Sequence, residues 1–465
     1  MRRRDFLTSA PVITAMVPGR ASTKTNVVMI MTDDHGAWSL GCYGNSEGYT
    51  PNLDGLAKDG ARFTRAYAAA AVCSPSRMTY LTGKIPSRHG VQDYIRDERS
   101  GPKARQFLKE HTTYSEILEG HSYTLGYFGK WHMGDAATPQ KGFTHWHTTA
   151  GGSYRATRFY RGGDVDEVEQ YPTDWITDRA IEFIEARRGQ PFFAQVSYNA
   201  PHTPYDFQPE KYRRPYRDSA FPAFPRDEPH VNQIEVYRKY LGNRESRWSY
   251  MALVRGVDQN VGLLLRKLDE LGLRQNTLVI FCADQGFNCG HHGVWGKGNG
   301  TLPFNMYEQT IQIPLLFRQP GTIAAGTVVE SMVSTLDFFP TLLDYLGLPA
   351  YRAPDLHGRS FAGFLKGDAP PQWQNKIHAE YAYVRMIRNE QFKYIQKADG
   401  HGDEMYDLEM DASESRNVAR DPTYAVERGR LKDELSTWFA VQGAPPIEEW
   451  RKTVRNALDP RHYDF

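Results

Sequence analysis

The chain has 465 residues, which is too long for one small core and suits a large domain joined to a smaller one. Its 56 basic and 55 acidic residues nearly cancel, which argues against a nucleic-acid-binding surface and against an acidic disordered tail. The four cysteines are too few for a disulfide framework, and the hydrophobic content of 40% is that of an ordinary globular protein.

The first residues resemble a twin-arginine export signal. Arg3-Arg4-Asp5-Phe6-Leu7 precedes a modestly apolar stretch from Thr8 to Val17, and Gly19-Arg20-Ala21 supplies small residues for a signal peptidase. The apolar stretch is too short to span a bilayer. We therefore predict a signal peptide over residues 1–21 and a periplasmic or secreted protein. The alternative is a frayed basic start. No other segment predicts a membrane span.

Short apolar runs alternate with amphipathic segments over the first three quarters of the chain. Buried strands are predicted at residues 27–31, 123–128, 192–198 and 277–282. Helices are predicted to open at Thr50-Pro51, to begin at a Thr173 cap with an apolar stripe through Ile184, and to run from Tyr250 to Leu271. This alternation predicts an α/β fold: a large, mostly parallel sheet with helices on both faces.

The pattern changes after Ala369-Pro370-Pro371, which indicates a linker. Short strands at 376–381, 384–388 and 392–396 and a helix at 424–441 predict a small antiparallel sheet with one helix. The predicted domains are therefore 22–370 and 371–465. Residues 203–245 show little periodicity, and two interpretations stay open for them: a substrate-shaping insertion or a plain surface loop.

Acidic residues follow two of the predicted strands directly. Asp33-Asp34 follow the first strand, and Asp284-Gln285 follow the strand at 277–282. The carboxyl ends of parallel strands are where such sheets bind ligands, and both aspartates of the first pair reach one ion only if the chain turns there. Oxygen ligands without zinc-spaced Cys or His predict a hard cation, and calcium fits best. Taken singly, each aspartate is more simply a turn former.

The segment Cys73-Ser74-Pro75-Ser76-Arg77 carries the strongest signal in the chain. Ser74 and Pro75 predict the cap and first residue of a helix, which puts Cys73 just before a helix N-terminus, where negative charge is favoured. Taken alone, Cys73 would be a small buried hydrophobe and Arg77 a surface cation.

Together with other motifs in the same order, this segment resembles the modification signature of the sulfatase family, whose fold is similar to that of alkaline phosphatase. The other matching motifs are Gly129-Lys130-Trp131-His132, Pro201-His202-Thr203-Pro204, Asp284-Gln285-Gly286 and Gly296-Lys297. The resemblance extends from Asn26 to about Ala419. The chain departs from it at Gln285, where the family most often has Asn or His.

The resemblance implies a role for each of these residues. A formylglycine-generating enzyme would convert Cys73 to formylglycine, whose hydrate attacks the sulfate, and Arg77 would hold that hydrate. Lys130 would pair with hydrate and sulfate, and His132 would take the proton that lets the sulfo-enzyme collapse. His202 and Lys297 would contact the sulfate, and one of them would protonate the leaving oxygen. The implied calcium ligands are Asp33, Asp34, modified Cys73, Asp284 and Gln285.

These observations predict an exported, calcium-dependent sulfatase. A sulfated sugar or polysaccharide fragment is the preferred substrate, because the chain is predicted to be exported, has nine Trp and 27 Tyr, and contains cationic aromatic stretches at 154–155, 158–161 and 212–214. An aryl sulfate is the nearest alternative. Further alternatives are a phosphodiester or phosphonate hydrolase of the same superfamily and a non-catalytic carbohydrate-binding relative. Neither nucleic acid nor a membrane is an expected partner.

Overall fold

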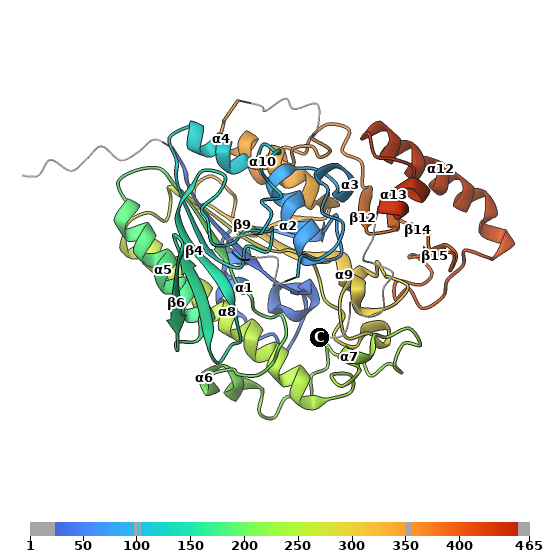
Figure 1. Cartoon of the computed structure of the whole chain (residues 1–465), viewed down its shortest axis with the longest axis horizontal. Helices are drawn as coiled ribbons and strands as arrows, with labels where there is room; N and C mark the ends of the chain where they lie inside the picture. Colours follow the sequence, from blue (N-terminus) through green and yellow to red (C-terminus); the bar gives the residue numbers. More distant parts are fainter. Residues whose placement is uncertain (1–23, 97–100, 102–103, 350–355, 454–465) are drawn as a thin grey trace, which may run out of the picture.

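The computed structural model describes residues 24–96, 101, 104–349 and 356–453 (Figure 1). The predicted export signal over residues 1–21 lies outside the described residues. Within them, no helix combines the length and the apolar composition that crossing a lipid bilayer requires.

Four parallel strands form the centre of the large sheet. The first, β1 (Asn26–Thr32), lies between β7 (Phe192–Ser197) and β8 (Thr277–Ala283), and β3 (Thr124–Gly129) pairs with the other side of β7. All three pairings are parallel, so the four strands end at the same edge of the sheet. The four predicted strands are confirmed, with small differences at their ends.

The sheet continues on both sides with strands that the sequence did not predict. Its order is β10-β2-β9-β8-β1-β7-β3-β4-β5-β6, and β11 also pairs with β2. Strand β9 runs antiparallel to β2 and β8, and β4, β5 and β6 form an antiparallel ribbon at one edge. The bounds of these strands are β2 (Ala61–Tyr67), β4 (Phe143–Gly152), β5 (Thr157–Arg161), β6 (Asp164–Val168), β9 (Gln312–Arg318), β10 (Thr327–Val329) and β11 (Val333–Ser334).

Helices cover both faces of the sheet, as predicted. Val27 and Met29 of β1 pack into one core with helices α2, α4 and α10, whereas Val28 and Ile30 pack into a second core with α1, α5 and α8. The alternation explains why the first strand is an unbroken apolar run: both of its faces are buried. The helices are α1 (Pro51–Lys58), α2 (Cys73–Thr82), α4 (Tyr114–Gly120), α5 (Pro172–Arg187), α8 (Arg244–Glu270) and α10 (Phe338–Tyr345).

Helices α5 and α8 do not start as the sequence predicted. Thr173 does not cap α5, because Pro172 is already helical and Tyr171 occupies the cap position. Helix α8 begins at Arg244 rather than Tyr250, because the Asn243 side chain accepts a hydrogen bond from the Glu245 amide and caps it. The remaining short helices are α3 (Pro86–His89), α6 (Glu210–Arg213), α7 (Glu235–Arg238), α9 (Glu308–Ile311) and α11 (Ala362–Lys366).

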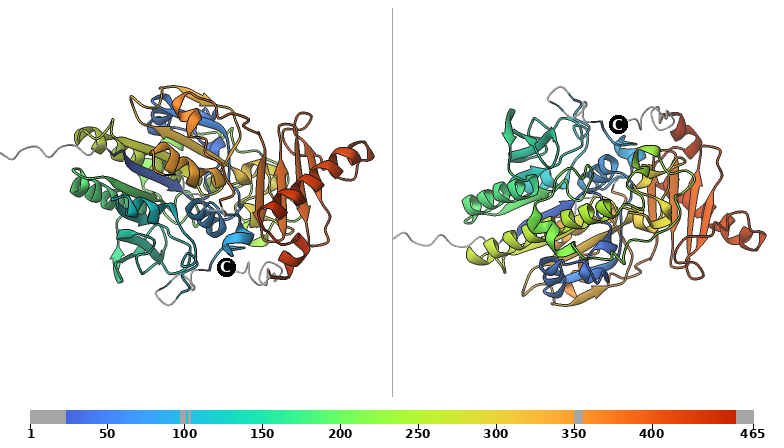
Figure 2. Two further views of the ribbon diagram at one scale, coloured as in Figure 1. Left: turned by 90° about the horizontal axis from the view of Figure 1, so that it is seen from above. Right: turned by 90° about the horizontal axis from the view of Figure 1, so that it is seen from below.

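A separate four-stranded antiparallel sheet lies toward the C-terminus, as predicted. Strands β12 (Ile377–Tyr381), β13 (Val384–Arg388), β14 (Phe392–Lys397) and β15 (Glu404–Asp407) follow in chain order. Helix α12 (Ala425–Val441) packs on β13 and β14. The sheet and α12 lie at the same end of the molecule in every view (Figures 1 and 2). Strand β15 and helix α13 (Ile447–Thr453) were not predicted.

A buried ionic cluster joins this small sheet to the rest of the molecule. Lys393 of β14 is fully buried, and its Nζ lies 2.7 Å from Glu308 Oε1 in α9 and 2.6 Å from Glu414 Oε1. Arg388 of β13 lies 3.3 Å from Glu308, and the Glu308 amide donates a 2.7 Å hydrogen bond to Glu414. Lys393 and Arg388 therefore tie the small sheet to α9 by contacts that are largely shielded from water.

Candidate active site

The candidate site lies where the four central strands end. Asp33-Asp34 follow β1, Asp284-Gln285 follow β8, Lys130 follows β3, and His202 lies five residues beyond β7. Cys73, the first residue of α2, completes the group, since its Sγ lies 3.1 Å from Asp33 Oδ1. The structure thus brings these distant segments together at the carboxyl ends of the central strands, which is the edge where such sheets bind ligands.

Backbone turns at the strand ends bring the side chains together. Asp34 has a φ of 60°, so the chain turns at the second aspartate, as the sequence argument requires. Gly129 has a φ of 109°, and a Cβ there would lie 1.9 Å from the carbonyl oxygen of Ser197. Only glycine fits this position. His132 has a φ of 58°, so Lys130 and His132 face one cavity across a turn, not along an extended segment.

Cys73 begins α2 without a side-chain cap. Val72 occupies the cap position, and the Ser74 hydroxyl instead accepts a 2.9 Å hydrogen bond from the Ile95 amide, so the predicted Ser74 cap is wrong. Cys73 is 1% exposed. Burial, together with the nearby Asp33 carboxylate, raises the pKa of its thiol to about 12. The encoded thiol is therefore protonated at neutral pH and is a poor nucleophile.

Arg77 binds the two strand ends that flank it. Its Nε donates to Asp284 at 2.8 Å, and its Nη1 donates to the Lys130 carbonyl at 2.9 Å and to Ser197 Oγ at 2.7 Å. Arg77 Nη2 lies 3.6 Å from Asp33 and has no hydrogen-bond partner, although it is buried. The guanidinium is thus fixed on one side and keeps a donor for a further acceptor.

Lys130 and Lys297 neutralise the first aspartate pair, and His202 lies beside it. Lys130 Nζ donates to Asp33, and Lys297 Nζ lies 2.6 Å from Asp34 Oδ1 and 2.7 Å from Cys73 Sγ. His202 Nε2 lies 3.6 Å from Asp34 Oδ2. Burial opposes the charge on Asp33, but Lys130 and His202 hold its pKa well below the usual range. The two lysines are the natural binding groups for an anion.

The oxygen atoms fit a hard cation. Atoms of Asp33, Asp34, Cys73 and His202 lie within 4.8 Å of one another. Gln285 Nε2 lies 2.6 Å from Asp34 Oδ1, whereas Gln285 Oε1 is buried without a hydrogen-bond partner. Burial and the Asp33 charge raise the pKa of Asp284 to about 7, which reflects crowded carboxylates. Three carboxylates with the Gln285 amide group beside them make an oxygen-rich donor set that suits calcium once the amide oxygen turns toward Asp34.

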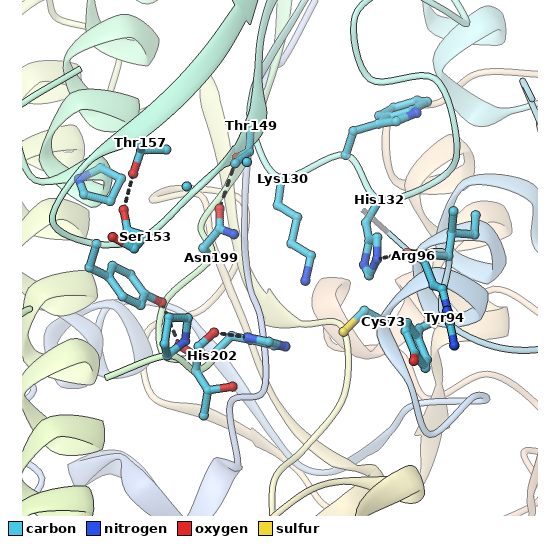
Figure 3. A pocket seen from close by; sticks show the side chains of 18 of the residues that line it. Cys73, Tyr94, Arg96, Lys130, His132, Thr149, Ser153, Thr157, Asn199 and His202 are labelled. Atoms are coloured by element: carbon cyan, nitrogen blue, oxygen red, sulfur yellow. Dashed lines mark hydrogen bonds between the residues drawn. The ribbon is translucent and has the colours of Figure 1, made fainter. Parts of the chain in front are cut away.

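His132 lies on the other side of Cys73 from His202 (Figure 3). Its Nε2 lies 2.6 Å from the Ile95 carbonyl oxygen, and its Nδ1 is buried without a hydrogen-bond partner. Burial, with Lys130 nearby, holds the pKa of this imidazole well below its usual value. A neutral ring whose Nε2 donates to a carbonyl carries its lone pair on Nδ1, which can accept a proton.

These side chains open into one cavity of about 590 Å³. Cys73, Lys130, His132, His202 and Lys297 line it, whereas Arg77 and the carboxylates lie beneath. Sequence reasoning missed much of the rest of the lining. Outside the predicted motifs, the further polar and aromatic lining residues are Tyr94, Arg96, Thr149, Ser153, Tyr154, Thr157, Asn199, Tyr237, Lys239, Tyr240 and Asn299. Within residues 203–245, Val236, Tyr237, Lys239 and Tyr240 line the cavity, although no motif identified them.

Comparison with known proteins agrees with this geometry. The sequence profile of the sulfatase family matches residues 25–348. This chain belongs to the sulfatase family. The profile of the C-terminal region of N-sulphoglucosamine sulphohydrolase also matches, over residues 290–440. Family membership makes the chain a sulfuric ester hydrolase.

Three relatives span most of this sulfatase. An N-acetylglucosamine-6-O-sulfatase of Bacteroides thetaiotaomicron is 28% identical, with 90% of this chain and 87% of the relative covered. Human arylsulfatase A is also 28% identical, with 88% and 83% covered. A protein solved in complex with its substrate D-glucosamine-2-N,6-O-disulfate superposes with a TM-score of 0.80 at 27% identity, covering 92% of this chain and all (100%) of that one.

Proposed function

We propose that this sulfatase is exported, depends on calcium, and hydrolyses sulfate esters of sugars or polysaccharide fragments by means of a formylglycine derived from Cys73. One observation carries the proposal: Cys73 begins a helix among Lys130, Lys297 and Arg77, directly above three buried carboxylates. The anion-binding groups and the cation-binding groups thus meet at one side chain. The two relatives whose names include a glucosamine sulfate support a sugar as the substrate.

The side chains around Cys73 fit both groups that the proposal requires, the calcium ion and the formylglycine. Asp33, Asp34, Asp284 and Gln285 would hold the calcium, with the oxygen of modified Cys73 in place of a sulfur that calcium does not favour. When present, the two groups supply an oxygen nucleophile and a positive charge at the sulfate. The poor nucleophilicity of the buried thiol is in keeping with its being a precursor.

The side chains of this chain divide the remaining work. Lys130, Lys297 and His202 bind the sulfate oxygens and offset the charge that builds up as the S–O bond breaks. One of Lys297 and His202 donates a proton to the leaving oxygen. His132 accepts a proton at its free Nδ1, and Arg77 holds the residue derived from Cys73 with its spare donor.

The test is the mass and activity of protein produced together with a formylglycine-generating enzyme. We expect the peptide containing Cys73 to have a lower mass than the encoded one, and Cys73→Ala to abolish turnover of a sulfated saccharide with the fold intact. Cys42→Ala is the matched control, because Cys42 is half-buried and does not line the cavity. Near-wild-type turnover by Cys73→Ala would remove formylglycine from the mechanism.

Two comparisons of substrates separate the alternatives. A higher kcat/KM for a sulfated saccharide than for an aryl sulfate supports the sugar, and the reverse supports an aryl sulfatase. Sulfate and phosphate esters of the same phenol distinguish a sulfatase from a phosphodiester or phosphonate hydrolase. Saccharide binding without turnover, by protein whose Cys73 is converted, would indicate a carbohydrate-binding protein. Cleavage after Ala21, observed by N-terminal sequencing of exported protein, tests the twin-arginine signal.

A further inference from the structure

One wall of the active-site cavity comes from the segment between β7 and α8. Val236, Tyr237, Lys239 and Tyr240, in and just after the short helix α7, line the same cavity as Cys73 and Lys297. None of them belongs to the motifs that carry out sulfate cleavage in the proposed mechanism. They lie beside Lys297, where they can contact the part of the substrate that bears the sulfate.

This wall is fixed to the loop that carries Lys297. The Ile234 amide donates to the Gly300 carbonyl at 3.0 Å, and Gln233 pairs with Thr301 in an isolated β-bridge. The Gln233 side chain also accepts from the Trp295 amide at 2.8 Å and donates to the Trp295 carbonyl at 3.2 Å. The segment is therefore held in place relative to Lys297 before a substrate arrives.

The wall presents aromatic rings. Tyr240 stacks on buried Trp295 with ring centroids 5.9 Å apart, and Tyr205 packs edge-on against Tyr240 at 5.4 Å. Burial raises the pKa of the Tyr237 phenol while the Lys297 ammonium lowers it, so Tyr237 lies within electrostatic range of the lysine that contacts Cys73. Supported aromatic rings are surfaces on which a sugar ring packs.

The wall also adds positive charge. The charged lining residues are Arg96, Lys130, Lys239 and Lys297, and no described lining residue is Asp or Glu. Lys130 and Lys297 are paired with the aspartates below. Lys239 is exposed and contacts the ring of Tyr240 at 5.1 Å, with no carboxylate in ion-pair range among the described residues. Lys239 therefore adds a positive charge at the cavity that no carboxylate of the described residues offsets, and such a charge attracts a ligand that carries a further negative group.

We propose that Val236, Tyr237, Lys239 and Tyr240 form the binding site for the sugar that bears the scissile sulfate, with Tyr237 and Tyr240 against the ring and Lys239 binding a second anionic substituent. This inference rests on the proposed action on sulfated sugars and narrows it to saccharides that carry a second sulfate or a carboxylate. Arg96 lies beside Tyr94, on the opposite side of Cys73 from Ser153 and Thr157 (Figure 3), and faces the same volume.

Equilibrium binding to a Cys73→Ala background tests the inference without turnover. The probes are a hexosamine with one sulfate, the same sugar with two sulfates, and a uronic acid with one sulfate, each followed by isothermal titration calorimetry. We expect the two dianionic probes to bind more tightly than the monosulfate. Lys239→Gln should weaken the preferred dianion about fivefold and leave the monosulfate unchanged. Tyr237→Leu should weaken all three probes by a similar factor.

Arg238→Gln is the matched control. Arg238 is the preceding residue, carries the same charge, pairs with Glu235 and does not line the cavity. It should leave every affinity unchanged. Equal binding of mono- and dianionic probes, persistence of the preference in Lys239→Gln, the same loss in Arg238→Gln, or no binding of any probe would each overturn the inference. Turnover of a sulfated saccharide by the converted wild-type protein, and its loss in Cys73→Ala, decide the proposed function separately.

Discussion

Replacing Lys393 by methionine removes the centre of the ionic cluster between the small sheet and α9. The lysine Nζ contacts Glu308, Glu414 and, at 3.1 Å, the Met306 carbonyl. Methionine fills a similar volume but supplies no charge and no donor. Glu308 keeps Arg388 as a partner at 3.3 Å, whereas Glu414 loses its nearest cation while it stays 3% exposed. Most of the loss in the free energy of unfolding therefore comes from leaving the buried Glu414 carboxylate without a cation.

The size of the effect depends on pH. Removing one partner of a buried ion pair costs about 3–5 kcal/mol. Burial already raises the pKa of Glu414 to about 7, and loss of Lys393 raises that pKa further. The folded variant then holds a proton that the unfolded chain releases above the ordinary glutamate pKa. Its stability consequently falls as pH rises, by about 1.4 kcal/mol per pH unit while Glu414 stays protonated only in the fold.

Urea unfolding at pH 5, 7 and 8, followed by circular dichroism and tryptophan fluorescence, measures this effect. The loss for Lys393→Met should be largest at pH 8 and smallest at pH 5. Arg416→Met is the control, because its ion pair with Asp421 is on the surface and Arg416 is 71% exposed, so the midpoint should not move. Equal losses for the two variants, or a loss at pH 5 as large as at pH 8, would refute the argument that Lys393 stabilises through buried charge.

Three further outcomes are expected. Adding calcium to chelator-treated protein should raise the free energy of unfolding by about 2.7 kcal/mol at a hundredfold excess over Kd, and the unfolding midpoint should rise with it. Asp33→Asn should remove most of that gain. An unchanged midpoint on addition of calcium would contradict the metal assignment. Burial lowers the pKa of His378 to about 3, so the free energy of unfolding should fall by about 1.4 kcal/mol per pH unit as the pH drops below 6.5. His378→Phe, which keeps the stack on Trp438, should flatten that decline in urea titrations. Identical pH profiles for the wild type and the variant would contradict this role of His378. Lys130→Ala and His132→Ala should each lower kcat about a hundredfold or more with unchanged circular dichroism, and rates near wild type would exclude these roles.

The central strands could be predicted because burial on both faces alone determines their apolar sequences. β1 and β8 are buried on both faces, which requires an unbroken apolar run and leaves a clear pattern. The ribbon of β4, β5 and β6 left none, since β6 is a mostly exposed, acidic strand at the sheet edge. Its pairing depends on neighbouring strands more than on its own residues.

The same distinction holds for the active site. The residues at strand ends and at the start of α2 follow from motifs whose positions are set by local chain geometry. The cavity also contains Tyr94, Arg96 and Lys239, whose segments pack against distant parts of the chain. The local sequence around these residues does not predict that packing. The misplaced Ser74 cap has a similar cause, because the Ser74 hydroxyl binds Ile95, 21 residues further along the chain.

The burial of α2 determines whether Cys73 can be modified before or after the chain folds. All ten residues of the helix are buried, and Cys73 touches side chains from strand ends as far along the chain as Lys297. Under the proposed mechanism, an enzyme that oxidises Cys73 needs access to the surrounding peptide, which is exposed only before α2 packs against the sheet. We therefore expect conversion to precede folding, and we expect protein that has folded with an unaltered thiol to stay inactive in the presence of the modifying enzyme until it is first unfolded.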